Sequence, residues 1–213
     1  MPLDKSISIE LPPLNIQTMD ICVIGDTPLI CHAWTSKAKK EMLDKQMKKA
    51  KPGRAAKDPE DDFKQSLYPL QGGGYGFPVI AFKDAAVTAC TSVAGITKVA
   101  ARQAFRVGAS LDGAELVKIE GAKPEPREDM VRIGMGKADI RYRGQFVHWW
   151  TKVRVRFNAN VLSAEQIVNL FNTAGFGVGV GEWRMEKDGQ FGCFHVASGE
   201  EVAALSGKKR RAA

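Results

Sequence analysis

The chain has 213 residues, which is enough for one large domain or two small ones with a real hydrophobic core. Hydrophobic residues make up 44% of it and charged residues 26%, which excludes a chain that is disordered throughout. The formal net charge of +7 favours a polyanionic partner, either nucleic acid or an anionic membrane surface. Lysine that serves only solubility is an equal alternative until the distribution of the charge is considered.

We expect a cytoplasmic protein without a membrane partner. The first residues, MPLDKSISIELPPL, lack a charged segment followed by an apolar one, so no signal peptide is expected. No run approaches about 18 apolar residues, so no transmembrane helix is expected. The cysteines are far apart, form no C-x-x-C pair and lie in apolar stretches, which predicts buried free thiols in a reducing compartment. They are Cys22, Cys31, Cys90 and Cys193.

The first third of the chain predicts a strand pair or a bent strand, followed by a lysine-rich excursion. Residues Ile16–Ile30 are rich in β-branched side chains around a turn at Gly25-Asp26. A helical pattern follows from Ser36 to Ala50. Between Lys37 and Lys57 there are nine basic and two acidic residues. This charge density, with Pro52 and Gly53, predicts that Lys48–Asp62 is mobile and outside the core.

The middle third predicts a hairpin and two helices. Glycines in Leu70–Tyr75 indicate the hairpin turn. Lys83–Ala94 has a helical pattern with small residues facing inward, and Thr97–Phe105 forms the second helix. Leu116–Ile119 is expected to be a strand and Lys123–Arg127, with two prolines, a loop. The second helix would carry a basic stripe at spacings of four residues, formed by Lys98, Arg102 and Arg106.

The last third has the clearest pattern. Residues Thr151–Asn158 alternate strictly between apolar and basic side chains, as in a strand with one buried face. Ser163 and Gln166 form a capping box for a helix that we expect to end at Gly175. A final strand is expected at Phe191–Ala197. This β-α-β order fits half of a ferredoxin-like βαββαβ domain.

The strongest electrostatic signal is the segment Arg141–Arg156, which holds two tryptophans and no acidic residue. Its cations suit phosphate groups, and stacking of a base on an aromatic ring contributes about 1–3 kcal/mol. The alternative is an ordinary solvated sheet face with its tryptophans in the core. The basic and aromatic residues are Arg141, Arg143, Trp149, Trp150, Lys152, Arg154 and Arg156.

The glycine-rich run Gly175–Gly181 has two interpretations. Backbone N–H groups without side chains in the way can reach anionic oxygens, as in a phosphate cradle. The run lacks the Lys-Ser/Thr ending of a Walker A loop and follows a helix, so nucleotide hydrolysis is not expected. Glycines at this spacing also permit tight packing of a helix against a strand.

The three histidines, His32, His148 and His195, have no companion at metal-ligand spacing, so neither a zinc site nor a cofactor is expected. His32 could act as a general base in metal-independent RNA cleavage, where a 2′-hydroxyl loses its proton. A packed or surface histidine is the favoured alternative, and we expect no enzymatic activity.

Two segments resemble a known superfamily. The run GFGVGVGEWRMEKDGQFGCF (175–194) looks like the glycine-rich loop of the RAMP superfamily, the RRM-like proteins of CRISPR systems. Residues Gly76–Cys90 resemble its proline-containing strand-to-helix element. The closer likeness is to the backbone subunits that polymerise along a guide RNA. The whole chain also resembles small proteins of tailed-phage and prophage genomes, which implies a phage-encoded protein in a bacterial host cell.

Together these features predict an α+β protein with a ferredoxin-like, RRM-like antiparallel sheet, two packed helices and flexible basic insertions. We expect one domain over residues 1–207, insertions near 37–66 and 121–147, and a basic disordered tail at 208–213. The expected function is non-catalytic binding of single-stranded DNA or RNA by a homo-oligomer or filament. The alternatives are a mimic that interferes with a CRISPR effector complex, an endoribonuclease using His32, and a basic face that docks onto an acidic protein.

The residues expected to contact nucleic acid are basic, aromatic or glycine residues in four segments. They are Lys37, Lys40, Lys98, Arg102, Arg106, Arg141, Arg143, Trp149, Trp150, Lys152, Arg154, Arg156, Gly177, Gly179, Gly181 and Arg184.

Overall fold

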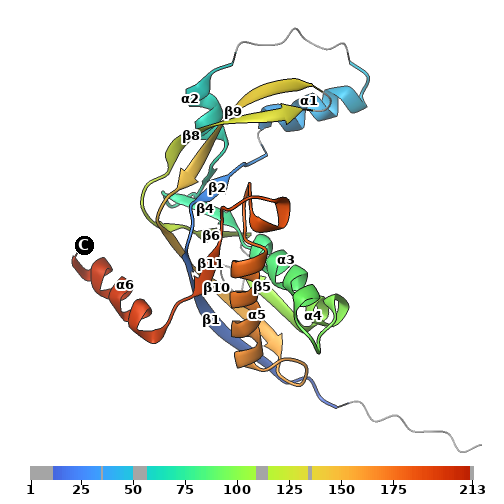
Figure 1. Cartoon of the computed structure of the whole chain (residues 1–213), viewed down its shortest axis with the longest axis vertical. Helices are drawn as coiled ribbons and strands as arrows, with labels where there is room; N and C mark the ends of the chain where they lie inside the picture. The colour runs from blue at the N-terminus through green and yellow to red at the C-terminus, as the bar shows by residue number, and fades with distance from the viewer. Residues whose placement is uncertain (1–11, 35, 50–56, 109–114, 134–135, 212–213) are drawn as a thin grey trace, which may run out of the picture.

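The computed structural model is an α+β arrangement of antiparallel sheets and helices, as predicted (Figure 1). It describes residues 12–34, 36–49, 57–108, 115–133 and 136–211. Among the helices of these ranges, none combines the length and apolarity that crossing a membrane requires.

The central sheet has five strands among the described residues. Four follow one another in the spatial order β11-β1-β10-β5, and the short β7 (Glu120–Gly121) also pairs with β10. The four are β1 (Ile16–Gly25), β5 (Phe105–Gly108), β10 (Trp149–Asn158) and β11 (Phe194–Val196). Every neighbouring pair is antiparallel. In chain order these strands are first, second, third and fourth, so the spatial order is 4-1-3-2. That order is the ferredoxin-like topology, and the predicted fold is confirmed.

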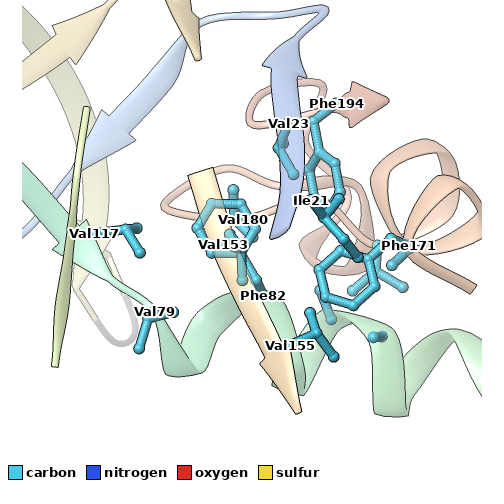
Figure 2. Close-up of a cluster of buried hydrophobic side chains, with 14 of the residues drawn as sticks. Ile21, Val23, Val79, Phe82, Val117, Val153, Val155, Phe171, Val180 and Phe194 are labelled. Carbon is cyan, nitrogen blue, oxygen red and sulfur yellow. The ribbon is translucent and has the colours of Figure 1, made fainter. Parts of the chain in front are cut away.

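Two helices complete the βαββαβ order and cover one face of this sheet. They are α3 (Ile80–Ala89), between β1 and β5, and α5 (Ala164–Gly177), between β10 and β11. Because β10 alternates, Val153 and Val155 point toward the helices and are fully buried. Figure 2 shows them gathered with Phe82 of α3 in the core. Burial of one such side chain contributes about 1.5–3 kcal/mol.

Helix α5 begins as predicted and ends later. The capping box is present, with Ser163 and Gln166 bonding each other's backbone N–H groups. Gly175 does not end the helix, which continues to Gly177. Instead, Gly175 lets α5 touch β11, because a Cβ there would lie 1.8 Å from the carbonyl oxygen of Phe194.

A second, three-stranded sheet lies beyond the central one, at the top of Figure 1. Its order is β2 (Leu29–Cys31), β9 (Lys137–Phe146) and β8 (Glu125–Ile133). The predicted loop at Lys123–Arg127 is wrong from Glu125 onward. Strand β8 is an edge strand of its sheet, so Pro126 can lack an N–H donor without breaking the ladder.

The second segment expected as an insertion forms two strands of this sheet, and helix α2 of the first such segment contacts it. Helices α1 (Ser36–Gln46) and α2 (Pro59–Gln65) come from the first segment, and β8 and β9 come from the second. The backbone N–H of Gly144 in β9 donates to the Ser66 hydroxyl just after α2, at 2.7 Å. The part of the predicted mobile excursion at residues 50–56 lies outside the described residues.

A third small sheet joins the other two. It contains β3 (Tyr68–Pro69), β4 (Tyr75–Pro78) and β6 (Leu116–Lys118), and it confirms the predicted hairpin. Helix α4 (Lys98–Ala104) follows the N-cap Thr97, as expected.

The first predicted helix of the middle third begins and ends earlier than expected. Helix α3 starts at Ile80, and a 3₁₀ turn, Cys90–Ser92, follows it. Of the cysteines, Cys22, Cys31 and Cys90 are buried free thiols as predicted, whereas Cys193 is half-buried. Burial raises the pKa of Cys31 to about 12.

The last described element is helix α6 (Gly199–Arg211), which in Figure 1 points away from the sheet on the side opposite α3 and α4. The Ser198 hydroxyl accepts from the N–H of Glu201, and the Glu201 carboxylate accepts from the N–H of Ser198. This reciprocal cap starts the helix. The helix includes residues 208–211 of the segment expected to be a disordered tail.

Candidate nucleic-acid interface

The outer face of the central sheet is the face turned away from α3 and α5. Paired residues of antiparallel strands share a face, so the register defines it. Lys152 pairs with Cys22, Arg154 with Asp20, and Arg156 with both Thr18 and Arg106. The cations of β10 therefore continue onto the edge strand β5.

Three of these cations are solvent-exposed and unpaired. Lys152, Arg156 and Arg106 are exposed, and none of them makes an ion pair among the residues that the structure describes. Arg106 and Arg156 are direct cross-strand partners. Like charges in that position repel each other, and an anion between them would remove the repulsion.

Arg154, on the same face, is already occupied. Its Nε and Nη2 donate to the two carboxylate oxygens of Asp20 at 2.6 and 2.9 Å. This hydrogen bonding, with the charges of Arg154 and Lys152, holds the pKa of Asp20 below its usual value. Asp20 is thus an internal competitor for any phosphate that approaches Arg154.

The two tryptophans have different environments. Trp149 is 2% exposed, and its indole N–H donates to the Thr27 carbonyl at 2.9 Å, so the stacking role expected for it does not fit. It belongs to the core because it shares the inward face with Val153. Trp150 points to the outer face and is partly exposed, beside its cross-strand partner Ile24.

Arg141 and Arg143 lie on β9, in the second sheet. Arg143 is 2% exposed and lies between Asp129 of β8, at 3.3 Å, and Glu182, at 3.4 Å. Two carboxylates from other segments already neutralise it, so its geometry does not favour the phosphate contact expected for it, which stays a prediction. Arg141 is half-buried on the same strand.

The glycine-rich loop packs onto β2 of the second sheet. Gly179 and Gly181 have positive φ angles of 73° and 82°, and a Cβ on Gly181 would lie 2.6 Å from the carbonyl oxygen of Ile30. The N–H of Glu182 donates to that carbonyl at 3.1 Å. These two glycines therefore serve close packing, the alternative interpretation of the run. Gly177, at the end of α5, has open space around it.

Arg184 holds this loop together. Its guanidinium donates to the Glu186 carboxylate at 2.7 and 3.0 Å and to the Gly181 carbonyl at 3.2 Å. It is half-buried and is thus partly engaged before any ligand arrives.

The remaining predicted cations fall in two places. Lys98 and Arg102 are exposed on α4, whereas Arg106 lies on β5, since the helix ends at Ala104. Lys37 and Lys40 are on α1, at the far end of the molecule from β10 in Figure 1. Sequence reasoning missed Lys83 of α3, which lies near Arg102 and Arg106. The available signal was that Lys83 is a basic residue in the predicted helix just before the stripe formed by Lys98, Arg102 and Arg106.

Two histidines have carboxylate partners. The Nδ1 atom of His32 is 3.4 Å from Glu182, and the hydrogen bond from His32 contributes to the lowered pKa of Glu182. His195, in β11, contacts Asp26 through Nδ1 at 2.6 Å and Glu201 through Nε2 at 3.2 Å. The described residues contain no group of three or more His, Cys, Asp and Glu side chains that could hold a metal ion.

No protein-family model matches the chain, and no curated protein matches it. Among solved structures it is similar to the crystal structure of Cmr6 from Pyrococcus furiosus, with 9% identity and a TM-score of 0.44. The alignment covers 87% of this chain and 100% of the Cmr6 chain. A likeness at this level assigns no function, and membership of the RAMP superfamily stays a prediction.

Proposed function

We propose that this protein binds single-stranded nucleic acid, without catalysis, across the outer face of its central sheet. The observation that carries the proposal is the group of exposed, unpaired cations on that face. Lys152, Arg156 and Arg106 lie on two paired strands with no ion-pair partner among the described residues. Their positive charge suits a phosphate backbone.

The shape and chemistry of the face favour a single strand. Its cations alternate with buried residues along β10, so they form a row across which an extended backbone can lie. Trp150, at one end of β10 on the same face, offers an aromatic surface to a base. A flat sheet with an aromatic and a basic row suits unpaired bases, whereas a duplex groove is usually read by a protruding helix or β-ribbon.

The direct test is fluorescence anisotropy with labelled oligothymidylate and oligouridylate of about 15 nucleotides. The variant Lys152→Gln with Arg156→Gln should bind more weakly. For every phosphate that this variant no longer neutralises, the slope of log K against log salt should become shallower by about 0.7. Use of both oligonucleotides compares DNA with RNA.

A matched control removes one lysine and one arginine elsewhere. Lys64→Gln with Arg132→Gln changes exposed residues of α2 and β8, far from β10, and should keep the slope of the wild type. Equal losses of affinity in the two double variants would show that only net charge matters. No binding by the wild type at low salt would refute the proposal.

The proposal includes several copies on one strand, as the resemblance implies. Large apolar side chains are available for contacts between copies, with Phe176 84% exposed and Met130 76% exposed. Electron microscopy with and without a long oligonucleotide should show rings or filaments only when the strand is present. The same arrays would fit a coat on replicating phage DNA. Competition with a CRISPR effector complex would instead require binding to that complex.

One observation favours a second candidate, a metal-independent endoribonuclease. His32 is 40% exposed, with its Nδ1 against Glu182, and its Nε2 has no partner among the residues that the structure describes. A carboxylate that orients an exposed imidazole is an arrangement that general bases use. Labelled RNA cleaved by the wild type and not by His32→Ala would establish this activity. Intact RNA in both samples would eliminate it.

A further inference from the structure

A second basic surface lies on the other side of the edge strand β5. The helices α3 and α4 border a groove of about 340 Å³, whose lining includes Lys83, Lys98 and Arg102. None of these three cations makes an ion pair among the residues that the structure describes. Among the described residues that line the groove, Asp84 is the one with a carboxylate.

The positive charge of Lys83 is disfavoured by its surroundings in this groove. Its ammonium lies 5.6 Å from the centre of the Phe105 ring, in a cation–π contact. Partial burial lowers the pKa of Lys83, and the charges of Arg106 and Arg102 lower it further, against the opposing effect of Asp84. Such a group of cations is stabilised when an anion enters.

The charge of Arg106 links the groove to the outer face of the sheet. Arg106 is the cross-strand partner of Arg156 on that face, and its charge also acts on Lys83 in the groove. Strand β5 is the last strand in the order of the central sheet, so in the part of the chain that the structure describes no further strand of that sheet lies between the two surfaces. The basic path therefore turns around the edge of the sheet and ends between the helices.

We propose that the groove between α3 and α4 binds a backbone phosphate of the same nucleic-acid strand, after that strand has crossed the sheet and passed the β5 edge. This inference rests on the proposed function and adds a position and a direction to it. Arg102 supplies a planar fork for the phosphate oxygens, and Lys83 and Lys98 supply point charges.

Three variants test the inference, and the two double variants among them each remove one lysine and one arginine. Lys98→Gln with Arg102→Gln removes the exposed cations of α4, and Lys83→Met keeps the apolar stem on Phe105 while removing its charge. Lys64→Gln with Arg132→Gln is the control. Circular dichroism melting identifies any variant that is not folded like the wild type.

The measurement is the affinity for labelled oligothymidylate of about 15 nucleotides over a salt series. The α4 double variant should bind about 3- to 30-fold more weakly at low salt, and its salt slope should be shallower by about 0.7 for each phosphate that it no longer neutralises. Lys83→Met should bind about 2- to 10-fold more weakly. The control should match the wild type.

The outcomes separate the two proposals. If the sheet-face double variant loses affinity and both groove variants bind like the wild type, the groove inference is wrong and the proposed function stands. If the wild type does not bind, both are wrong. A loss of affinity in the groove variants equal to that of the control would also overturn the inference, since net charge alone would then explain it.

Discussion

Strands β9 and β10 carry similar rows of basic residues, and the fold uses them in opposite ways. On β10, Lys152 and Arg156 face solvent with no ion-pair partner among the described residues. On β9, Arg143 is buried between Asp129 and Glu182. Strand β9 also carries Asp139 on the face of Arg141 and Arg143, whereas β10 carries no acidic residue. The difference at Arg143 nevertheless lies outside its own strand, because both of its carboxylate partners belong to other segments. It comes from the segments that pack against each strand.

The largest expected effect concerns stability and tests the role of the buried Arg143 on β9. Arg143→Met should lower the free energy of unfolding by about 3 kcal/mol, because it leaves the 8%-exposed Asp129 with one guanidinium partner fewer. Arg127 still donates to Asp129 at 2.8 Å and limits the destabilisation. Urea denaturation measures the change.

The matched change on β10 is Arg156→Met, which should alter the unfolding free energy by less than about 0.5 kcal/mol. If the two substitutions destabilise the protein equally, the distinction between a structural arginine on β9 and a solvent-exposed arginine on β10 is wrong.

The second effect concerns the glycine-rich loop, which packs beside β9. Gly181→Ala should cost about 1–3 kcal/mol of stability, since the residue has a φ of 82° and its Cβ would press on the Ile30 carbonyl. Gly177→Ala meets open space at the end of α5 and should leave stability unchanged or slightly raised. Thermal melting compares the two variants. An unchanged melting temperature for Gly181→Ala would restore the loop as a candidate phosphate cradle.

These contrasts show what local patterns can predict. The alternation of Thr151–Asn158 places each side chain of β10 on the correct face, because a strand repeats every two residues. The capping box at Ser163 likewise locates the start of α5, since both partners lie within one turn. Such features depend on neighbours in sequence. The ferredoxin-like strand order follows from the same elements together with the resemblance.

Long-range partners could not be predicted in this way. The carboxylates that neutralise Arg143, the Thr27 carbonyl that accepts from Trp149 and the backbone against Gly175 all come from distant segments. A short window of sequence carries no information about these contacts. Arg106 shows the same limit. Its four-residue spacing from Arg102 predicted a shared helix face, but α4 ends at Ala104 and Arg106 lies on β5.

A smaller effect concerns oligonucleotide affinity and tests the proposed role of the cations on β10. Asp20→Asn should strengthen oligonucleotide binding about 2- to 5-fold at low salt, because it releases Arg154 for phosphate and removes a negative charge from the face. The decrease in stability should stay below about 1 kcal/mol, since both side chains are substantially exposed. Anisotropy titration against the wild type gives the ratio. Weaker or unchanged binding would show that the oligonucleotide does not contact Arg154.

The smallest effect is a pH dependence at the far end of the same face, where His195 of β11 pairs with Ile24 of β1. Partial burial alone would lower the pKa of His195, but hydrogen bonds and charges from Asp26 and Glu201 outweigh it and raise the pKa. The stabilisation is therefore complete below the unfolded-state pKa of about 6.5, and it is lost as the pH rises through the raised folded-state pKa. Because Glu201 belongs to the first turn of α6, the contact between that helix and the sheet weakens over the same pH range.

His195→Gln should remove this part of the pH dependence in urea titrations above pH 6.5, whereas His148→Gln, at an exposed position, should keep it. The same pH profile in His195→Gln and the wild type would show that this histidine does not hold α6.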